Sequence, residues 1–391
     1  MAKEIKTIGV LTSGGDAPGM NAAIRAVVRT ALNKGLKVKG IQKGYNGLLN
    51  DEIIDMDKRS VADIIQRGGT VLYTARCMEF MTEEGQKRGA EVCRKHGIDG
   101  IVVIGGDGSF RGAQKLADAG VNTIGLPGTI DLDIACTDYT IGFDTAVNTA
   151  MQAIDKIRDT STSHERCSII EVMGRNAGWL TAASALARIE GRKVPQLIYL
   201  CEKAFDEDRF IEDVNEALKK ENNIIIAVSE GVKTADGNYV GEETKSGKED
   251  VFGHKYLSGV GKYLEGLVGE KIGCKVRSVE LNILQRCAGY MLSETDIMES
   301  RNLGAFAAVS AIRGKSGKMS AVRRISDDPY QVEIVLSDLS KIANYEKKVP
   351  MEWINEEGND IKDELLTYLK PLIQGEVQIP YENGIPKRFI L

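Results

Sequence analysis

The chain has 391 residues and a formal net charge of −5, with 27% charged and 42% hydrophobic residues. This length leaves room for two domains with well-buried cores. The slightly acidic balance, without lysine- or arginine-rich runs, excludes the electrostatic footprint of a nucleic-acid-binding protein or of an anionic-membrane-binding protein.

Targeting segments and redox centres are the next classes that the sequence argues against. The opening residues MAKEIKTIGVLTSGGD contain no apolar core of a signal peptide, and no run of about 18 apolar residues follows, so a soluble cytoplasmic protein is expected. The seven cysteines are scattered without a CxxC pair and are expected to be reduced. The three histidines lack ligand spacing, so catalysis is expected to use carboxylates, arginines and backbone amides.

The first part of the chain alternates β-rich and helical patterns. Strands are predicted over 6–13, 36–42, 99–106 and 121–128, and a helix over 19–35. Such alternation is typical of parallel βαβ units with helices on both faces of the sheet.

The second part repeats this alternation. Strands are predicted over 166–173, 196–201 and 223–230, separated by helices near 177–189 and over 207–220. The sequence therefore predicts an α/β protein with two doubly wound, mainly parallel three-layer (αβα) domains and an active site in the cleft between them.

The domain boundaries follow from this division. A first domain is expected over 1–145, completed by part of 290–391, and a second over 146–290. The charged, glycine-dotted stretch 233–250 is expected to be an exposed loop, and 325–391 a C-terminal extension.

Polar, glycine-rich loops follow five of the predicted strands. They are TSGGDAPGMN (12–21), GGDGS (105–109), PGTIDLD (127–133), MGRNAG (173–178) and SEG (229–231). Because ligands of open parallel sheets bind at the carboxyl ends of strands, these loops are expected to line a binding site.

The first two loops have the composition of phosphate cradles. Gly14-Gly15 and the stretch 105–109 both precede helices, and glycine lets backbone N–H groups approach an anion that a helix N-terminus also attracts. A tight, capped strand-to-helix turn remains the alternative for either loop. The chain has neither GxxxxGK[ST] nor GxGxxG spacing, which argues against a P-loop and against a dehydrogenase.

The third loop adds reactive groups. Asp131 and Asp133 lie two residues apart, which in a strand-like segment places both carboxylates on one side, and Thr129 adds a hydroxyl. A base and a magnesium ligand are the groups that phosphoryl transfer needs, together with cations on the transferred group. Four arginines near predicted strands are candidates for those cations: Arg166, Arg175, Arg277 and Arg286.

Taken together, these motifs resemble the 6-phosphofructokinase family. TSGGDAPGMNAAIR, GGDGS, PGTID, TDYTIGFDTA and SHERCSIIEVMGR match in order over residues 5–180, and SEG and QRCAG extend the likeness to about residue 320. The resemblance points to the longer branch of the family, in which users of ATP and of pyrophosphate are mixed. It implies transfer of the ATP γ-phosphate to the C1 hydroxyl of fructose 6-phosphate, in glycolysis.

The resemblance also implies roles for single residues. Asp131 would be the base, Thr129 would position sugar and phosphate, and Arg175 would stabilise the transferred phosphate. Asp107 and Asp133 would hold Mg²⁺. The nucleotide would contact Gly14, Arg76, Cys77, Gly106, Asp107, Gly108 and Ser109.

The sugar phosphate would be held in the second domain. Besides Thr129, Asp131 and Arg175, its ligands by resemblance are Met173, Gly174, Glu230 and Arg286, with Arg166 and Arg277 reaching the site of a neighbouring subunit. This sharing implies a homodimer or homotetramer.

The phosphate donor depends on two small residues. Pyrophosphate-using relatives usually carry aspartate at the position of Gly108 and lysine at that of Gly128, so the two glycines favour ATP. Leu132, where the family usually has asparagine, and Ile283, where short bacterial ATP enzymes have a histidine, depart from the family pattern. A pyrophosphate-dependent enzyme and a catalytically silent, ligand-binding paralogue stay open as alternatives.

Overall fold

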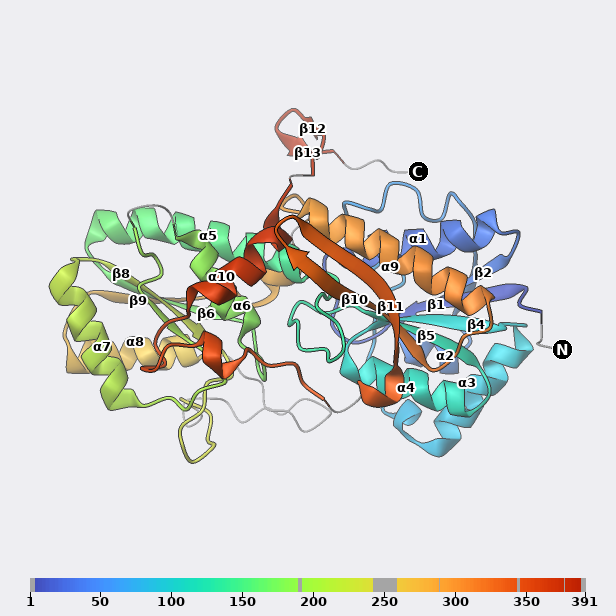
Figure 1. Ribbon diagram of the computed structural model, residues 1–391, viewed down its shortest axis with the longest axis horizontal. Helices are drawn as coiled ribbons and strands as arrows, with labels where there is room; N and C mark the ends of the chain where they lie inside the picture. The colour runs from blue at the N-terminus through green and yellow to red at the C-terminus, as the bar shows by residue number, and fades with distance from the viewer. Residues whose placement is uncertain are drawn as a thin grey trace. The chain divides into compact units, whose positions relative to one another are not determined.

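The computed structural model describes residues 4–188, 192–241, 259–287, 289–342, 345–375 and 377–387 (Figure 1). The chain divides into two compact units. Unit 1 comprises Met1–Thr145, Arg286–Tyr345 and Leu372–Leu391, and unit 2 comprises Ala146–Gln285 and Glu346–Pro371. Of the loop expected over 233–250, residues 242–250 lie outside the described residues.

Unit 1 is built on a seven-stranded sheet in the order β11-β10-β5-β4-β1-β2-β3. Its strands are β1 (Thr7–Thr12), β2 (Lys37–Ile41), β3 (Ile53–Met56), β4 (Gly100–Gly105), β5 (Asn122–Pro127), β10 (Lys318–Asp327) and β11 (Tyr330–Asp338). The five inner strands run parallel, and β3 and β11 close the two edges in antiparallel pairs. All residues of β1 and β4 are buried, as expected of parallel strands covered on both faces.

Helices cover both faces of this sheet. α1 (Met20–Asn33) packs against α9 (Glu294–Ile312) on one face, and α2 (Gly44–Leu49), α3 (Glu83–Lys95) and α4 (Asp107–Asp118) lie on the other (Figure 1). Unit 1 also contains two 3₁₀ turns, Glu79–Met81 and Leu339–Lys341, and a small hairpin of β12 (Tyr381–Glu382) and β13 (Ile385–Pro386).

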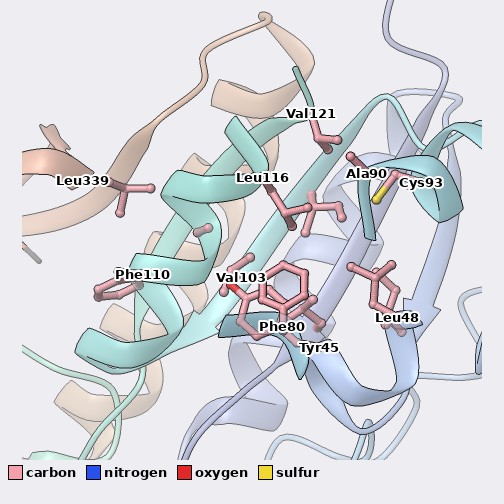
Figure 2. Packing of buried hydrophobic residues seen from close by; sticks show 14 of the residues in the cluster. Tyr45, Leu48, Phe80, Ala90, Cys93, Val103, Phe110, Leu116, Val121 and Leu339 are labelled. Atoms are coloured by element: carbon pink, nitrogen blue, oxygen red, sulfur yellow. The ribbon is translucent and has the colours of Figure 1, made fainter. Parts of the chain in front are cut away.

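The core beneath α2, α3 and α4 fixes the start of α4. The rings of Tyr45 and Phe80 stack with centroids 4.1 Å apart, and both belong to the same buried cluster as Phe110 and Leu116 (Figure 2). The buried Tyr45 hydroxyl donates to the Ser109 carbonyl at 2.6 Å, and burial raises the pKa of this tyrosine. The core therefore holds the GGDGS loop through its backbone.

The loops after β1 and β4 meet at the point where the strand order reverses. The Ser13 amide donates to the Ile104 carbonyl at 2.9 Å. A Cβ placed on Gly105 would lie 2.4 Å from the Ser13 carbonyl oxygen and 2.4 Å from Ser109 Oγ. Only glycine permits this approach, at the place where open α/β sheets bind their ligands.

A buried polar network ties α9 to the segment TDYTIGFDTA. The Asp296 carboxylate accepts hydrogen bonds from the Gly142 amide at 3.0 Å, from the Thr145 amide at 3.2 Å and from Thr145 Oγ1 at 2.6 Å. It also accepts one from the Tyr139 hydroxyl, which in turn contacts Ser300 Oγ at 3.0 Å. This motif is thus part of the scaffold of unit 1, because its polar groups are paired inside the unit.

Three buried carboxyl groups share this region. Burial raises the pKa of Asp296, of Asp144 and of Glu299, the last to about 7, and their mutual repulsion acts in the same direction for Asp144 and Glu299. Neither carboxylate oxygen of Asp144 has a hydrogen-bond partner among the described residues. Protonation relieves the cost of burying these charges.

Unit 2 contains a four-stranded, fully parallel sheet in the order β7-β8-β6-β9. Its strands are β6 (Cys167–Val172), β7 (Leu197–Tyr199), β8 (Ile224–Ser229) and β9 (Val276–Glu280). The helices are α5 (Phe143–His164), which begins in unit 1, α6 (Trp179–Ala183), α7 (Glu207–Lys220), α8 (Val260–Lys271) and α10 (Asp363–Leu369). Its 3₁₀ turns are Ser184–Ala187, Asn282–Arg286, Met351–Trp353 and Lys370–Ile373. The second and the last of these each include residues of both units.

The predicted fold class is confirmed, and the predicted strands match observed ones within one or two residues at each end. The segment expected as a C-terminal extension, 325–391, is instead divided. β10 and β11 complete the sheet of unit 1, whereas 346–371 packs in unit 2. Among the described residues, no helix combines the length and the apolar composition needed to cross a membrane.

We expect Gly105→Ala to lower the thermal denaturation midpoint by several degrees. The added methyl group meets the Ser13 carbonyl and Ser109 Oγ at 2.4 Å, and such overpacking typically costs about 1–3 kcal/mol. Gly108→Ala is the matched control, because no atom lies within 4 Å of a Cβ there. Equal midpoints for the two variants would contradict the close approach of the two loops.

We expect Glu299→Gln to stabilise the protein at pH 8 and to leave it nearly unchanged at pH 5. The folded-state pKa of about 7 lies above the ordinary 4.5, so the protonated form is favoured by folding and stability falls as pH rises through 7. This shift corresponds to roughly 3 kcal/mol. Thermal denaturation at both pH values measures it, with exposed Glu91→Gln as control; the same change at both values would contradict the buried charge.

Candidate functional site

The N-terminus of α4 forms the centre of the site in unit 1. Gly106 precedes the helix in an extended conformation, Asp107 is its first residue, and Ser109 is buried. The Asp107 carboxylate pairs with Arg111 at 2.5 Å on the next turn. The positive end of the helix suits an anion, and the space beside Gly108, with no atom within 4 Å of a Cβ there, leaves room for one.

The PGTIDLD loop lies against this helix start. The Gly128 amide donates to the Gly105 carbonyl at 3.0 Å, and a Cβ on Gly106 would lie 4.0 Å from Thr129 Cβ. Thr129 Oγ1 accepts a hydrogen bond from the Asp131 amide at 3.2 Å. Thr129 and Asp131 are thereby fixed beside the glycine loop.

Residues 129–134 are irregular rather than a strand, yet their burial alternates. Ile130, Leu132 and Ile134 are buried, while Thr129, Asp131 and Asp133 remain partly exposed. Leu132 adopts a left-handed conformation with φ of 54°, a region that costs a residue with a Cβ roughly 1–2 kcal/mol and that asparagine tolerates better. The departure at Leu132 therefore adds an apolar side chain to the core at the expense of local backbone strain.

Asp107 and Asp133 are chemically suited to Mg²⁺. This ion is usually held by one or two carboxylates plus substrate phosphates and water, and both side chains are carboxylates with partial exposure. Within the described ranges, no group of three or more histidine, cysteine or acidic residues is arranged to hold a metal.

The segment after β3 is hydrogen-bonded to the first glycine loop. Thr12 Oγ1 donates to the Tyr73 carbonyl at 2.9 Å, and Thr74 Oγ1 donates to the Gly14 carbonyl at 2.7 Å. Gly14 itself has a φ of 86°, which glycine adopts readily. Arg76, two residues after Thr74, is exposed. The side chain of Cys77 packs against the core, and burial raises the pKa of its thiol.

Arg286 belongs with unit 1. Its guanidinium carbon would lie 3.4 Å from a Cβ on Gly15, so this arginine lies against the first glycine loop. The structure therefore groups Arg286 with Gly14, Asp107 and Thr129 in unit 1, and places Met173, Gly174, Arg175 and Glu230 together in unit 2.

In unit 2, the ends of the paired strands β6 and β8 bring the second group together. Val172 pairs with Ser229, and the Gly174 amide donates to Glu230 Oε1 at 3.3 Å. A Cβ on Gly231 would lie 1.9 Å from the Arg175 carbonyl oxygen, so the SEG loop supports the backbone of Arg175 directly.

Arg166 and Arg277 lie at the other end of this sheet. Arg166 directly precedes β6, and Arg277 is the second residue of β9, paired with Ser168. At a strand rise of about 3.3 Å per residue, roughly 20 Å separates these positions from Met173. The four arginines thus do not form one group within the chain.

Two residues that support these loops carry no sequence signal. Thr74 is an ordinary polar residue in a turn, and Glu202 lies in the unremarkable stretch LCEKAF, yet its carboxylate binds the Gly178 amide at 2.8 Å. Both act on backbone groups of distant loops, and such contacts leave no spacing pattern.

Comparison with known proteins agrees with this geometry. The profile of the Phosphofructokinase family matches residues 7–312. An ATP-dependent 6-phosphofructokinase of Clostridium botulinum strain Hall is 51% identical over 283 residues, which cover 71% of this chain and 86% of the relative. One of Clostridium novyi is 47% identical over 352 residues, covering 87% and 100%.

Solved structures give the same family. A pyrophosphate-dependent phosphofructokinase from Marinobacter aquaeolei matches with a TM-score of 0.87 at 28% identity, covering 98% of this chain and 95% of that one. One from Nitrosospira multiformis matches with the same score and identity, covering 98% and 96%. The chain therefore belongs to the phosphofructokinase family.

Proposed function

We propose that this chain is an ATP-dependent 6-phosphofructokinase, which transfers the γ-phosphate of ATP to the C1 hydroxyl of fructose 6-phosphate and acts in the cytoplasm. The observation that carries the proposal is the meeting of three loops in unit 1: the two glycine loops at the β1–β4 switch point and the Thr129–Asp131 pair beside them. The relatives at 51% and 47% identity, both named ATP-dependent, support this choice.

Asp131 acts as the base for the attacking hydroxyl. Its backbone is fixed by Thr129 Oγ1, and its side chain is partly exposed beside the start of α4. The proton of the C1 hydroxyl passes to the carboxylate as the oxygen attacks phosphorus, and ADP leaves from the opposite side. Thr129 positions the two reactants, which removes much of the entropic barrier.

The remaining groups balance charge on the phosphates. Gly14, Gly106, Gly108 and Ser109 line the donor site with Asp107 at the helix start, and Arg76 and the main chain at Cys77 flank the same loop. Asp107 and Asp133 would hold Mg²⁺, which when bound would neutralise the negative charge that develops during transfer. Arg175 stabilises the transferred phosphate, while Met173, Gly174, Glu230 and Arg286 bind the sugar phosphate.

Arg166 and Arg277 serve a neighbouring subunit. Their position at the amino ends of β6 and β9, away from Met173–Arg175, supports this role, since they cannot reach the sugar-phosphate loops of their own unit. The active enzyme is accordingly a homodimer or homotetramer.

Pyrophosphate use is the second candidate, because both solved structures compared above are named pyrophosphate-dependent. Gly108 favours ATP, because it leaves open the space that an aspartate side chain would fill beside the nucleotide. No described atom lies within 4 Å of a Cβ at this position. Gly128 is more constrained: a Cβ there would lie 2.9 Å from Met20 Cε and 3.0 Å from Ile104 Cγ2, so a lysine requires these side chains to shift.

We expect purified protein with Mg²⁺ and fructose 6-phosphate to form fructose 1,6-bisphosphate with ATP and much more slowly with pyrophosphate. Gly108→Asp should lower kcat/KM for ATP by roughly a hundredfold, because the new carboxylate repels the nucleotide phosphates. Initial rates with both donors measure this. A wild-type preference for pyrophosphate, or ATP turnover that survives Gly108→Asp, would overturn the choice of donor.

We expect Asp131→Asn to reduce kcat by roughly 10²–10⁴-fold while the affinity for fructose 6-phosphate changes little, because the amide keeps the shape but takes no proton. Steady-state kinetics and equilibrium binding separate the two effects. Asp118→Asn, an exposed substitution at the far end of α4, is the matched control. Parallel loss of turnover and binding would make Asp131 a binding residue rather than the base.

A further inference from the structure

The loop 174–179 carries Arg175 and is held by contacts on two sides. On the β8 side, Glu230 binds the Gly174 amide at 3.3 Å, and Gly231 lies directly against the Arg175 carbonyl. These contacts come from the strand next to β6, as expected of neighbouring strand ends. The other side of the loop is held by a part of the chain almost 170 residues away, as shown by the contact between Trp179 and Lys347.

That distant part is residues 346–353, here termed the strap. Asn176 Nδ2 donates to Glu346 Oε1 at 2.6 Å, and the indole Nε1 of Trp179 donates to the Lys347 carbonyl at 2.9 Å. The two contacts lie on either side of Gly178, so the strap runs along the loop rather than touching it at one point.

Glu202, which follows β7, joins the loop to the strap. Its Oε1 accepts the Gly178 amide at 2.8 Å and the Val349 amide at 3.0 Å. A Cβ on Gly178 would lie 2.5 Å from Glu202 Oε2, so the glycine admits the carboxylate to this position. One carboxylate thus satisfies backbone donors of two segments that are far apart in sequence, and such charge-assisted bonds are the stronger kind.

An aromatic cluster completes the contact. The ring of Trp179, which is 1% exposed, lies 6.2 Å from Trp353 and 5.8 Å from Tyr368. Lys347 Nζ lies 5.1 Å from the Trp179 ring centroid and donates to the Tyr368 hydroxyl at 3.1 Å. Cation–π contact and aromatic packing therefore fix the strap on the loop.

We propose that the strap holds Arg175 in the geometry that phosphoryl transfer requires, with Glu202, Glu346 and Lys347 as positioning residues. The proposal rests on the proposed function, which gives Arg175 its role. An arginine that stabilises a transition state acts through a fixed position, so freedom of its loop lowers kcat rather than substrate affinity. The strap lies beyond residue 312, where the family profile ends.

The kinetic test uses exposed residues first. Asn176→Ala and Glu346→Ala each remove one partner of an exposed hydrogen bond, so folding is preserved. Each is expected to lower kcat about three- to tenfold at nearly constant KM, and the double variant no further than either one. Glu352→Ala, an exposed glutamate of the strap with no contact to the loop recorded in the described residues, is the matched control and retains full activity.

The central bridge gives a larger effect. Glu202→Ala leaves two backbone donors without their acceptor and is expected to lower kcat about ten- to a hundredfold. Glu202→Gln keeps an acceptor oxygen at the same place and is expected to restore most of kcat. If Glu202 contributed only to general stability, Glu202→Ala would leave kcat unchanged at temperatures well below unfolding, and there would be no loss for Glu202→Gln to restore.

Tryptophan fluorescence measures whether the strap is packed on the loop, independently of enzyme activity. The chain has two tryptophans, Trp179 and Trp353, and both lie in this contact. In a Trp353→Phe background, Trp179 alone reports, and Glu202→Ala is expected to shift its emission to the red as water reaches the ring.

The outcomes separate the two proposals. A red shift with lowered kcat at constant KM supports the positioning role. A red shift with unchanged kcat, or a loss confined to KM, overturns it while leaving the proposed function intact. Absence of fructose 6-phosphate phosphorylation in the wild type overturns the proposed function, and the positioning role with it.

Discussion

The close approach of the backbone at Ser13 to that at Gly105 is the constraint on which unit 1 depends. It requires a residue without a side chain at the end of β4, and it brings the loops after β1 and β4 within hydrogen-bonding distance. The PGTIDLD loop follows on the next strand, β5, because parallel neighbours end at the same edge. The position of the two glycine loops and the position of Asp131 therefore have one structural origin.

Sequence patterns predicted those parts of the fold that repeat. The buried strands such as β1 and β4 are continuous apolar runs followed by glycine, and their ends fall within a residue or two of the prediction. β10 and β11 were not predicted, because β10 is buried only over part of its length and β11 is half-exposed throughout, which removes the apolar run. Their place in the sheet depends on a parallel pairing of β10 with β5, far away in sequence.

The candidate site divides in the same way. Loop composition predicted Gly14, Asp107, Thr129 and Asp131 as site residues, since the strand-end loops in which they lie are rich in glycine and charged residues. It did not identify Thr74 or Glu202, which act on backbone atoms of other loops. It also grouped four arginines by residue type. Arg166 and Arg277 lie at the amino ends of β6 and β9, however, whereas Arg175 lies beyond the carboxyl end of β6. Position along a strand, which composition does not encode, decides which cations can act together.

The buried carboxyl groups around α9 have a consequence for an enzyme of sugar breakdown, a process whose end products are acids. Most proteins lose stability as paired carboxylates take up protons. Glu299, with a pKa of about 7, and the raised Asp144 and Asp296 take up protons on folding instead. These three groups therefore favour the folded state of unit 1 more strongly as the pH falls, and their contribution to its stability is lost on the alkaline side.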